Sequence, residues 1–252
     1  MEVKRYFIEL SYNGGAYHGW QRQPNAISVQ QVLEESLSKL LRENISILGA
    51  GRTDTGVHAS QMFAHFDLTT VIEDPKELVF LLNGFLPNDI AIKKIHRVIS
   101  SAHARFDASE RSYEYHTATV KDPFYAAFHH YLKNKPDIDL MNQATKILLA
   151  YEDFKCFSRS NTDVKTFLCN IKTAEWRPEG TSLVFYIRAN RFLRNMVRAI
   201  VGTLLEIGFE KRAVEDMESI IKSRDRSQAG FSAPAKGLYL TEILYPQDLF
   251  ID

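Results

Sequence analysis

The chain has 252 residues, of which 45% are hydrophobic and 25% are charged, the composition of an ordinary globular protein. This composition excludes a disordered chain or a fibrous repeat, and the length allows one large domain or two smaller ones. Basic and acidic residues each number 31, so the formal net charge is +0. A uniformly basic protein is therefore excluded, whereas a locally basic surface is not.

Cysteine use and the apolar stretches predict the compartment. The two cysteines, Cys156 and Cys169, have neither the number nor the spacing of a disulfide framework or a zinc knuckle, which favours a reducing compartment. Charged residues interrupt the first twelve positions, where an export signal would need an apolar core. They also interrupt the most apolar long stretch, 192–209, which is therefore not a membrane span. We expect a cytoplasmic protein without membrane contact.

Strand-like and helix-like patterns alternate through the first half of the chain. Ser28 with Gln31 three residues later predicts a helix start, and Asp74 followed by Pro75 predicts another. In chain order we expect a strand at 4–12, a helix opening at Ser28, strands at 45–50 and 57–68, a helix from 74 to about 86, and a strand at 90–98.

The second half continues in the same style without repeating the sequence. It predicts a strand at 112–120, a helix at 139–150, a hairpin of 167–177 and 182–189, helices at 191–207 and 214–222, and a strand at 238–245. About eight strands and five helices, with several strands adjacent in sequence, indicate an α+β fold with largely antiparallel pairing. We expect two fused halves, 1–106 and 107–252.

A glycine-rich segment, 49–56, lies between two predicted strands. It presents the guanidinium of Arg52 and the carboxylate of Asp54 together, and its glycines allow a large ligand to come close. A tight turn in which the aspartate and the threonines only bond the backbone explains the same residues. A phosphate-binding loop is disfavoured, because no Lys-Ser/Thr pair and no helix follow.

Three arginines, Arg191, Arg194 and Arg198, open the helix predicted at 191–207. Their spacing places them within roughly 60° of one another on a helix. Such a stripe is either a solvated face, a surface for a polyanion, or a source of one arginine that turns inward to pair with a carboxylate.

Two tyrosines, Tyr113 and Tyr115, share one face of the strand predicted at 112–120. Tyrosines on a sheet pack in a core or, in a protein that handles RNA, form a platform for an unstacked base. The eight histidines show no ligand spacing: His58 and His65, an odd number of positions apart on one strand, point to opposite faces. We expect no metal and no cofactor.

Several blocks of the sequence, in their order along the chain, resemble the bacterial tRNA pseudouridine synthase A family, and the resemblance runs nearly from end to end. The segment GAGRTDTGVHA at 49–59 is similar to the signature around that family's catalytic aspartate. The other family-like blocks are Tyr17–Gln23 with Val29-Gln30, Leu86–Ile90, His103–Phe106, Arg111–Tyr113, Ala189–Arg198 and Ala233–Leu238.

The resemblance implies an isomerase that converts uridine to pseudouridine at positions 38, 39 and 40 of tRNA. It implies two mainly antiparallel halves with an active-site cleft between them, and a homodimer without cofactor. Asp54 matches the catalytic aspartate, Tyr113 the tyrosine that stacks on the target base, Arg198 the basic partner of the aspartate and Arg52 the arginine beside it. We expect three further residues to contact RNA: Asn190, Arg191 and Arg194.

Two other functions remain as alternatives. A non-catalytic RNA-binding protein could use the same scaffold, although binding alone does not need a carboxylate among basic groups. A phosphoryl-transfer enzyme could use Asp54 as phosphate acceptor, but it would need a DxD arrangement or a set of magnesium ligands at that residue, and the sequence around Asp54 shows neither.

Overall fold

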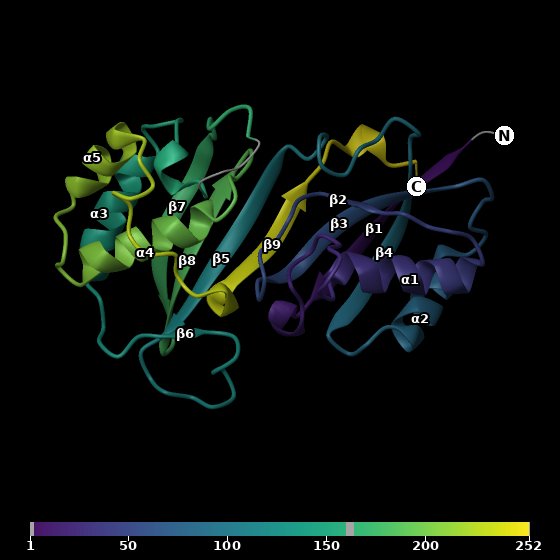
Figure 1. Cartoon of the computed structure of the whole chain (residues 1–252), viewed down its shortest axis with the longest axis horizontal. Helices are drawn as coiled ribbons and strands as arrows, with labels where there is room; N and C mark the ends of the chain where they lie inside the picture. Colours follow the sequence, from purple (N-terminus) through teal and green to yellow (C-terminus); the bar gives the residue numbers. More distant parts are fainter. Residues whose placement is uncertain (1–2, 160–163, 252) are drawn as a thin grey trace. The chain divides into compact units, whose positions relative to one another are not determined.

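The computed structural model of this chain describes residues 3–159 and 164–251. Within these ranges it contains five α-helices and nine strands, which confirms the predicted α+β class (Figure 1). The described residues up to Ser109 and from Leu240 onward form one compact unit, and those of Glu110–Tyr239 form a second. No helix in the described ranges is long and apolar enough to cross a membrane. The division into 1–106 and 107–252 stays a prediction.

The first unit is built on strands in the order β4-β1-β3-β9, in which β1 runs antiparallel to both of its neighbours. Helices α1 and α2 lie against one face of this sheet (Figure 1). The elements are β1 (Lys4–Tyr12), α1 (Val29–Leu41), β2 (Leu48–Gly49), β3 (His58–Leu68), α2 (Pro75–Phe85), β4 (Ile90–Val98) and β9 (Leu238–Leu244), with β2 paired to β3.

Strand β1 is buried on both faces, although its sequence alternates. Tyr6, Phe7 and Ile8 are consecutive and each is at most 1% exposed. The reason is the end of the chain, which covers the second face: the ring of Phe7 contacts Tyr245 at 5.2 Å and Phe250 at 6.1 Å between centroids. Sequence patterning predicts the strand but not this cover, because the covering residues are more than 230 positions away.

Both predicted helix starts in the first unit are confirmed. The Ser28 hydroxyl accepts a hydrogen bond from the backbone N–H of Gln31 at 3.3 Å, and the Asp74 carboxylate accepts from the next two free N–H groups, with Pro75 as the first helical residue. In place of the reciprocal half of the capping box, the Gln31 side chain donates to Glu35.

The strand predicted at 45–50 is wrong for most of its length. Only Leu48–Gly49 pairs with β3. Ile45 and Ile47 are buried like strand residues, but their backbone N–H groups donate to the side chains of Ser38 and Glu34 on α1. Helix side chains thus replace the strand ladder here, and an apolar pattern cannot distinguish the two partners.

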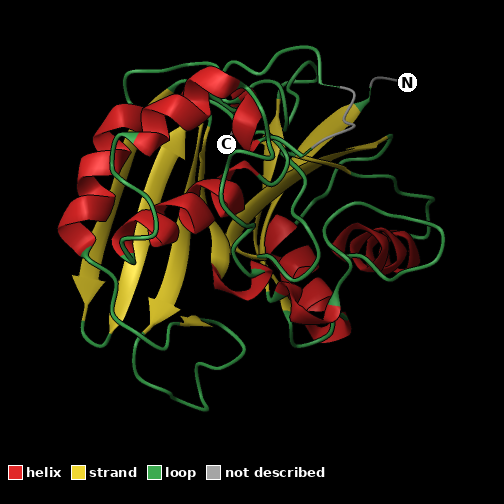
Figure 2. Ribbon diagram, turned by 60° about the vertical axis from the view of Figure 1, so that its left-hand side comes forward, coloured by secondary structure: helices red, strands yellow, loops and turns green. Residues whose placement is uncertain are grey.

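The second unit has strands in the order β5-β8-β7, with β6 parallel to β5. Helices cover one face of this sheet (Figure 2), where α3 packs on both β7 and α4. The elements are β5 (Glu110–Ala118), β6 (His130–Tyr131), α3 (Ile138–Leu148), β7 (Ile171–Glu179), β8 (Ser182–Ala189), α4 (Met196–Gly208) and α5 (Asp216–Ser223). Short 3₁₀ helices occur at Gly14–Ala16, Lys155–Phe157, Ala235–Gly237 and Gln247–Leu249.

The hairpin predicted in the second unit is confirmed, with a tighter turn. Glu179 pairs with Ser182, so the loop has two residues, and Gly180 takes the positive φ of 59° that such a turn requires. The strand continues past its predicted end at 177 and includes Pro178. Proline is tolerated because β7 lies at the edge of the sheet order.

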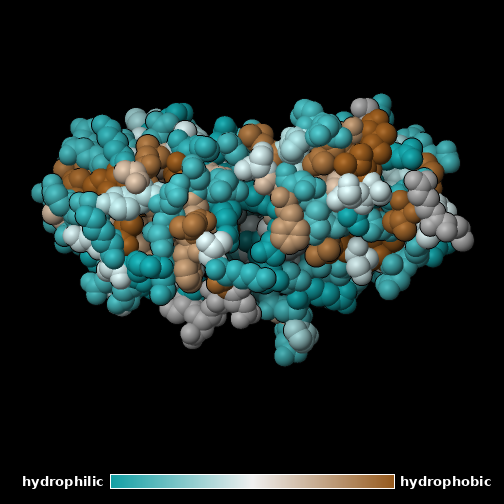
Figure 3. Space-filling view, turned by 90° about the horizontal axis from the view of Figure 1, so that it is seen from above, coloured by the Kyte–Doolittle hydropathy of each residue, from teal (hydrophilic) through white to brown (hydrophobic). Residues whose placement is uncertain are grey.

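Apolar surface is scattered. Figure 3 shows one face on which hydrophobic residues form separate patches among hydrophilic ones. The most exposed large apolar side chains in the described chain are Phe124 at 86%, Phe80 at 77% and Phe106 at 73%.

Candidate active site

The loop that carries Asp54 is anchored on both sides of that residue. The backbone oxygen of Thr53 accepts from Trp20 N at 3.2 Å, and the Thr53 hydroxyl bonds the Tyr12 hydroxyl at 2.9 Å. Two residues after Asp54, the N–H of Gly56 donates to the backbone oxygen of Tyr17 at 3.4 Å. Asp54 is therefore held between two fixed neighbours.

Two glycines allow the segment 14–20 to approach this loop. A side chain at Gly14 would overlap the backbone oxygen of Val57. A Cβ at Gly19 would lie 2.5 Å from the backbone oxygen of Thr53, and Gly19 has a φ of 89° that favours glycine. Both glycines therefore leave room for the main chain of a loop that is distant from them in the sequence.

The loop itself is a tight turn, as one of the two interpretations of its sequence required. Val57 N donates to the backbone oxygen of Asp54 at 3.1 Å, and Gly56 has a φ of 77°. The turn uses the main-chain oxygen of Asp54, while its side chain is half-buried and Arg52 is exposed. The turn thus does not exclude a chemical role for the carboxylate.

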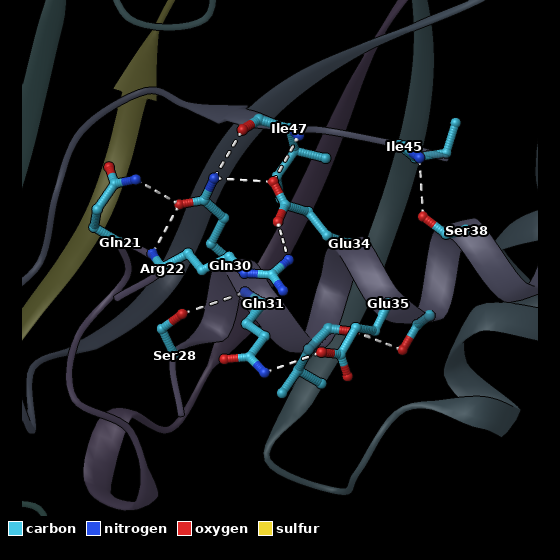
Figure 4. Close-up of polar contacts among 12 residues, drawn as sticks. Gln21, Arg22, Ser28, Gln30, Gln31, Glu34, Glu35, Ser38, Ile45 and Ile47 are labelled. Carbon is cyan, nitrogen blue, oxygen red and sulfur yellow. Dashed lines mark hydrogen bonds and ion pairs between the residues drawn. The ribbon is translucent and has the colours of Figure 1, made fainter. Parts of the chain in front are cut away.

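A buried polar network supports the same loop from α1, and the sequence analysis missed it (Figure 4). The Glu34 carboxylate accepts from Gln30 Nε2 at 3.0 Å, from Ile47 N at 3.1 Å and from Arg22 Nη1 at 3.1 Å. Gln30 in turn accepts from Arg22 N and from the Gln21 side chain, and donates to the Ile47 oxygen. Glu34 is 7% exposed and Gln30 is 8% exposed.

This network connects both approaches to the Asp54 loop. Gln21 and Arg22 follow Trp20, which bonds Thr53, and Ile47 leads into β2 just before the loop. The available signal was Gln30 and Glu34, two polar residues four positions apart, because that spacing places them on one helix face. Whether such a face is buried cannot be decided from the helix sequence alone.

Tyr17 is held by Asp89, which belongs to the family-like block Leu86–Ile90. Its hydroxyl donates to the Asp89 carboxylate at 2.5 Å, and the Asp89 backbone oxygen accepts from Asn13 N at 2.9 Å. Burial and the neighbouring carboxylate raise the pKa of Tyr17 above its ordinary value. The phenol therefore stays a donor, and Asp89 fixes the segment on which the loop rests.

In the second unit, the two tyrosines of β5 have different environments. Tyr113 is half-buried, and its ring meets the ring of Phe192 edge to face at 5.1 Å. Tyr115 is fully buried and donates its hydroxyl to the Pro234 oxygen at 2.9 Å, and burial raises its pKa despite the opposing charge of Arg198. Tyr115 is therefore a core residue, and Tyr113 is the one of the two that is partly exposed.

The predicted stripe of three arginines on one helix face is wrong. Helix α4 begins at Met196, so Arg191 and Arg194 precede it. Asn195 has a φ of 67°, a left-handed conformation that asparagine tolerates better than most residues, and its amide donates to the Ser232 hydroxyl. The apolar spacing of 192–205 fits a continuous helix, but it contains no signal for this local reversal.

Arg198 lies on α4 and fastens it to the strap, the segment Ala229–Pro234. Its Nε donates to the Ala233 oxygen at 2.7 Å, and the Ala233 N–H donates back to the Arg198 oxygen at 3.0 Å. Gly202 permits this approach, since a side chain there would overlap the Phe231 oxygen. Arg198 therefore has a structural role in addition to any chemical one.

The other predicted RNA contacts also lie in the second unit. Arg194 is exposed, and its backbone oxygen accepts from Arg159 N. Arg191 is half-buried and close enough to Cys169 to lower the pKa of that thiol slightly against the effect of burial. Asn190 accepts from Asn170 N at 2.7 Å through its amide oxygen, which ties it to the residue before β7.

Metal and thiol chemistry find little support in the described residues. No group of three or more His, Cys, Asp or Glu side chains in ranges 3–159 and 164–251 is placed to hold a metal ion. Both cysteines are buried and free, and burial raises the pKa of Cys156 to about 12 and that of Cys169 to about 11. At neutral pH neither is a thiolate.

A family model for tRNA pseudouridine synthase matches residues 10–107 and 144–246 of this chain. The chain belongs to this family. It is 50% identical over 248 residues to a tRNA pseudouridine synthase A of Parabacteroides distasonis, covering 98% of each chain. It is also 50% identical over 251 residues to one of Bacteroides fragilis, covering 99% of this chain and all of the relative.

More distant members of the tRNA pseudouridine synthase family match over the same length. A tRNA pseudouridine synthase A of Francisella tularensis is 36% identical over 250 residues, which is 98% of this chain and 96% of the relative. The matched ranges of the family model include the Asp54 loop, Glu34 and Arg198, whereas Tyr113 lies between them.

Proposed function

We propose that this protein converts uridine to pseudouridine in the anticodon arm of tRNA, at positions 38, 39 and 40, with Asp54 as the catalytic group. Membership of the tRNA pseudouridine synthase family supports the reaction. The observation that carries the role of Asp54 is the anchored loop, in which both flanks of that residue are fixed by hydrogen bonds from 12–20.

The chemistry suits a single carboxylate. Pseudouridine is an isomer of uridine: the C1′–N1 bond breaks, a C1′–C5 bond forms, C5 loses its proton and N1 gains one. Breaking the first bond places positive character on the sugar, as in glycoside hydrolysis, where a carboxylate is nucleophile or charge stabiliser. An isomerisation consumes no oxidant and no nucleotide, so we propose that no cofactor takes part.

We propose that Tyr113, Arg52 and Arg198 bind the substrate. A uridine in or beside a stem has to leave the helix before it can react, at a cost of a few kcal/mol. Stacking on one aromatic ring returns about 1–3 kcal/mol. The half-buried ring of Tyr113, fixed by its edge contact with Phe192, is suited to this role.

We assign phosphate contacts to the basic residues outside the loop. Arg191 and Arg194, with Asn190, would bind the RNA backbone, and acidic residues elsewhere would balance the net charge. Such contacts release counterions, so the affinity for tRNA should fall steeply as salt rises. We also propose a cytoplasmic homodimer, for which sedimentation equilibrium across micromolar concentrations is the test; a monomer throughout would contradict it.

Pseudouridine mapping on an unmodified tRNA tests the proposed reaction. Wild-type protein should convert uridines 38–40, and Asp54→Asn should convert none while it still binds tRNA. Binding without conversion by either protein would favour a non-catalytic RNA-binding protein. Conversion by both would remove Asp54 from the mechanism and leave the reaction intact.

The stacking role of Tyr113 needs a separate comparison. Tyr113→Phe keeps the ring and should keep the affinity for tRNA, whereas Tyr113→Leu should lose activity. A fully active Tyr113→Leu would contradict the assignment.

A further inference from the structure

Three aromatic rings of the second unit form a column outside the residues assigned so far. Tyr125 stacks on His129 at 4.9 Å between centroids with planes 13° apart, and His129 stacks on His116 at 5.4 Å with planes 20° apart. These separations are those of offset stacking. We call this set the ring column.

The inner end of the ring column is fixed in the fold. His116 lies on β5, where its Nε2 is 2.9 Å from the Glu114 carboxylate and its ring meets Tyr239 edge to face at 4.8 Å. The outer end is open: Tyr125, in the loop between β5 and β6, is 53% exposed. The column therefore runs from the sheet to the surface.

The loop that carries Tyr125 is held in one conformation by hydrogen bonds. The backbone oxygen of Tyr125 accepts hydrogen bonds from the N–H groups of both Phe128 and His129 at 2.9 Å. The next carbonyl, that of Ala126, accepts from Lys236 Nζ at 2.7 Å, and the Phe128 oxygen accepts from the Tyr239 hydroxyl at 3.2 Å. The exposed ring is thus presented in advance, which lowers the entropy lost when a ligand stacks on it.

We propose that the outer face of Tyr125 is a second stacking site, which binds an unpaired nucleobase of the RNA substrate. A base is a flat ring of the kind that continues such a column, and stacking tolerates any base because each has a π-face. Lys236, fastened to the same loop, adds positive charge suited to a nearby phosphate. The inference rests on RNA being the substrate.

The ring column shares no residue with those assigned to the target uridine. Residues 108–143, which contain Tyr125, His129 and His116, lie between the two ranges that the family model matches. The site therefore adds to the contacts proposed for the target uridine: it would hold a second nucleotide of the same RNA and increase affinity without touching the reacting atoms.

Tryptophan fluorescence tests this site directly. The native tryptophans, Trp20 and Trp176, are 1% and 2% exposed, so Tyr125→Trp introduces the one strongly exposed indole. Tyr131→Trp is the matched control, because Tyr131 is 47% exposed and lies on β6 outside the column. Acrylamide quenching of each variant is measured with unmodified tRNA, a single-stranded oligonucleotide and a fully paired RNA duplex.

We expect tRNA and the single strand to quench the emission of the Tyr125→Trp variant and to protect its new indole from acrylamide, and the duplex to do neither. The new indole of Tyr131→Trp should remain accessible throughout. Equal protection of the control variant, or protection of Tyr125→Trp by the duplex, would show coverage by the RNA backbone and overturn the proposal. So would an unprotected indole in Tyr125→Trp at saturating tRNA.

Affinity supplies the second measurement. Tyr125→Ala should weaken tRNA binding about 5- to 100-fold, Tyr125→Phe should leave it within about twofold, and Tyr131→Ala should behave like wild type. The rate at saturating tRNA should not change in any of them. Unchanged affinity of Tyr125→Ala would overturn the proposal.

Pseudouridine formation by wild type is assayed in parallel, so that the two proposals fail separately. If wild type is inactive but RNA still protects the new indole of Tyr125→Trp, the proposed reaction is contradicted and the stacking site stands. An active wild type, together with an unprotected indole in Tyr125→Trp, would do the reverse.

Discussion

The Asp54 loop in the first unit and helix α4 in the second are held in place by the same kind of contact, but different groups complete the attachment in the two units. In both, a glycine lets one main chain approach another: Gly14 faces the Val57 oxygen, and Gly202 faces the Phe231 oxygen. In the first unit uncharged groups complete the attachment, through Trp20 N and the Tyr12 hydroxyl. In the second unit the charged side chain of Arg198 does so itself.

Because of this difference, mutation can separate structure from chemistry at Asp54 but not at Arg198. The groups that anchor the Asp54 loop through the bonds described above belong to other residues, so Asp54 can be changed with those anchors left in place. Arg198 combines an anchoring bond with a proposed role in substrate binding. An inactive Arg198 variant is therefore ambiguous until its stability has been measured.

The largest effects should come from the two glycines. We expect Gly14→Ala and Gly202→Ala each to lower the free energy of unfolding by about 3 kcal/mol or more, because the new Cβ meets a main-chain oxygen and not a flexible side chain. Urea denaturation followed by circular dichroism measures this. Gly84→Ala is the control, since nothing lies within 4 Å of its Cβ. Wild-type stability of either variant would show that its glycine is not required for the close approach of the two main chains.

Arg198 should show the next largest effect, on two readouts. We expect Arg198→Met to lower stability by about 2 kcal/mol, because the Ala233 oxygen loses its donor, and to lower pseudouridine formation far more than tRNA binding. Asp54→Asn should lower activity at nearly unchanged stability. Thermal unfolding and single-turnover kinetics of both variants give the contrast. A fully stable Arg198→Met would show that its bond to the strap is dispensable.

Acid should destabilise the protein through His65. Burial, with smaller effects of Arg5 and His103, lowers the pKa of His65 to about 4, while its value in the unfolded chain is about 6.5. Below pH 6.5 the unfolded chain binds a proton that the folded one refuses, so stability falls between pH 6.5 and 4, by about 2 to 3 kcal/mol. His65→Asn keeps an acceptor for Ala104 N and should flatten this part of the profile. Identical slopes of stability against pH in wild type and His65→Asn would show that His65 does not cause the loss.

The smallest effects should come from glycines in open surroundings. Gly51 belongs to the Asp54 loop, yet nothing lies within 4 Å of its Cβ position and it has no positive φ. We expect Gly51→Ala to change stability by less than about 0.5 kcal/mol, and Gly84→Ala in α2 to raise it by about 0.5–1 kcal/mol. A large loss in Gly51→Ala, measured by urea denaturation, would mean that the whole loop is as constrained as its anchors.

Local signals in the sequence predicted most elements because those elements depend on neighbouring residues. The caps at Ser28 and Asp74 and the hairpin turn between residues 177 and 182 depend on residues within a few positions, and all three are confirmed. The strand at Ile45 and Ile47 failed because its hydrogen bonds go to helix side chains. The start of α4 failed because the left-handed Asn195 leaves no mark on apolar periodicity.

For the candidate site, sequence reasoning named candidate residues but not the contacts that hold them in place. Asp54, Tyr113 and Arg198 came from a resemblance, and their roles stay predictions. The buried network of Glu34 and Gln30 escaped notice, because a polar pair on a helix is usually solvated and only tertiary packing buries it. Gly49 escaped notice for the same reason: a side chain at this position would overlap the ring of Trp20, which is distant in the sequence.

The return of the last residues to the first unit bears on how the protein is made. The ring of Phe7 needs Tyr245 and Phe250 as neighbours, and Ala104 needs the Tyr245 hydroxyl, which donates to its oxygen at 2.5 Å. A ribosome delivers these partners more than 230 residues after Phe7. The second unit, continuous from Glu110 to Tyr239, is fully synthesised before them. The first unit, whose translation begins earlier, therefore cannot complete this packing until the second unit has been synthesised.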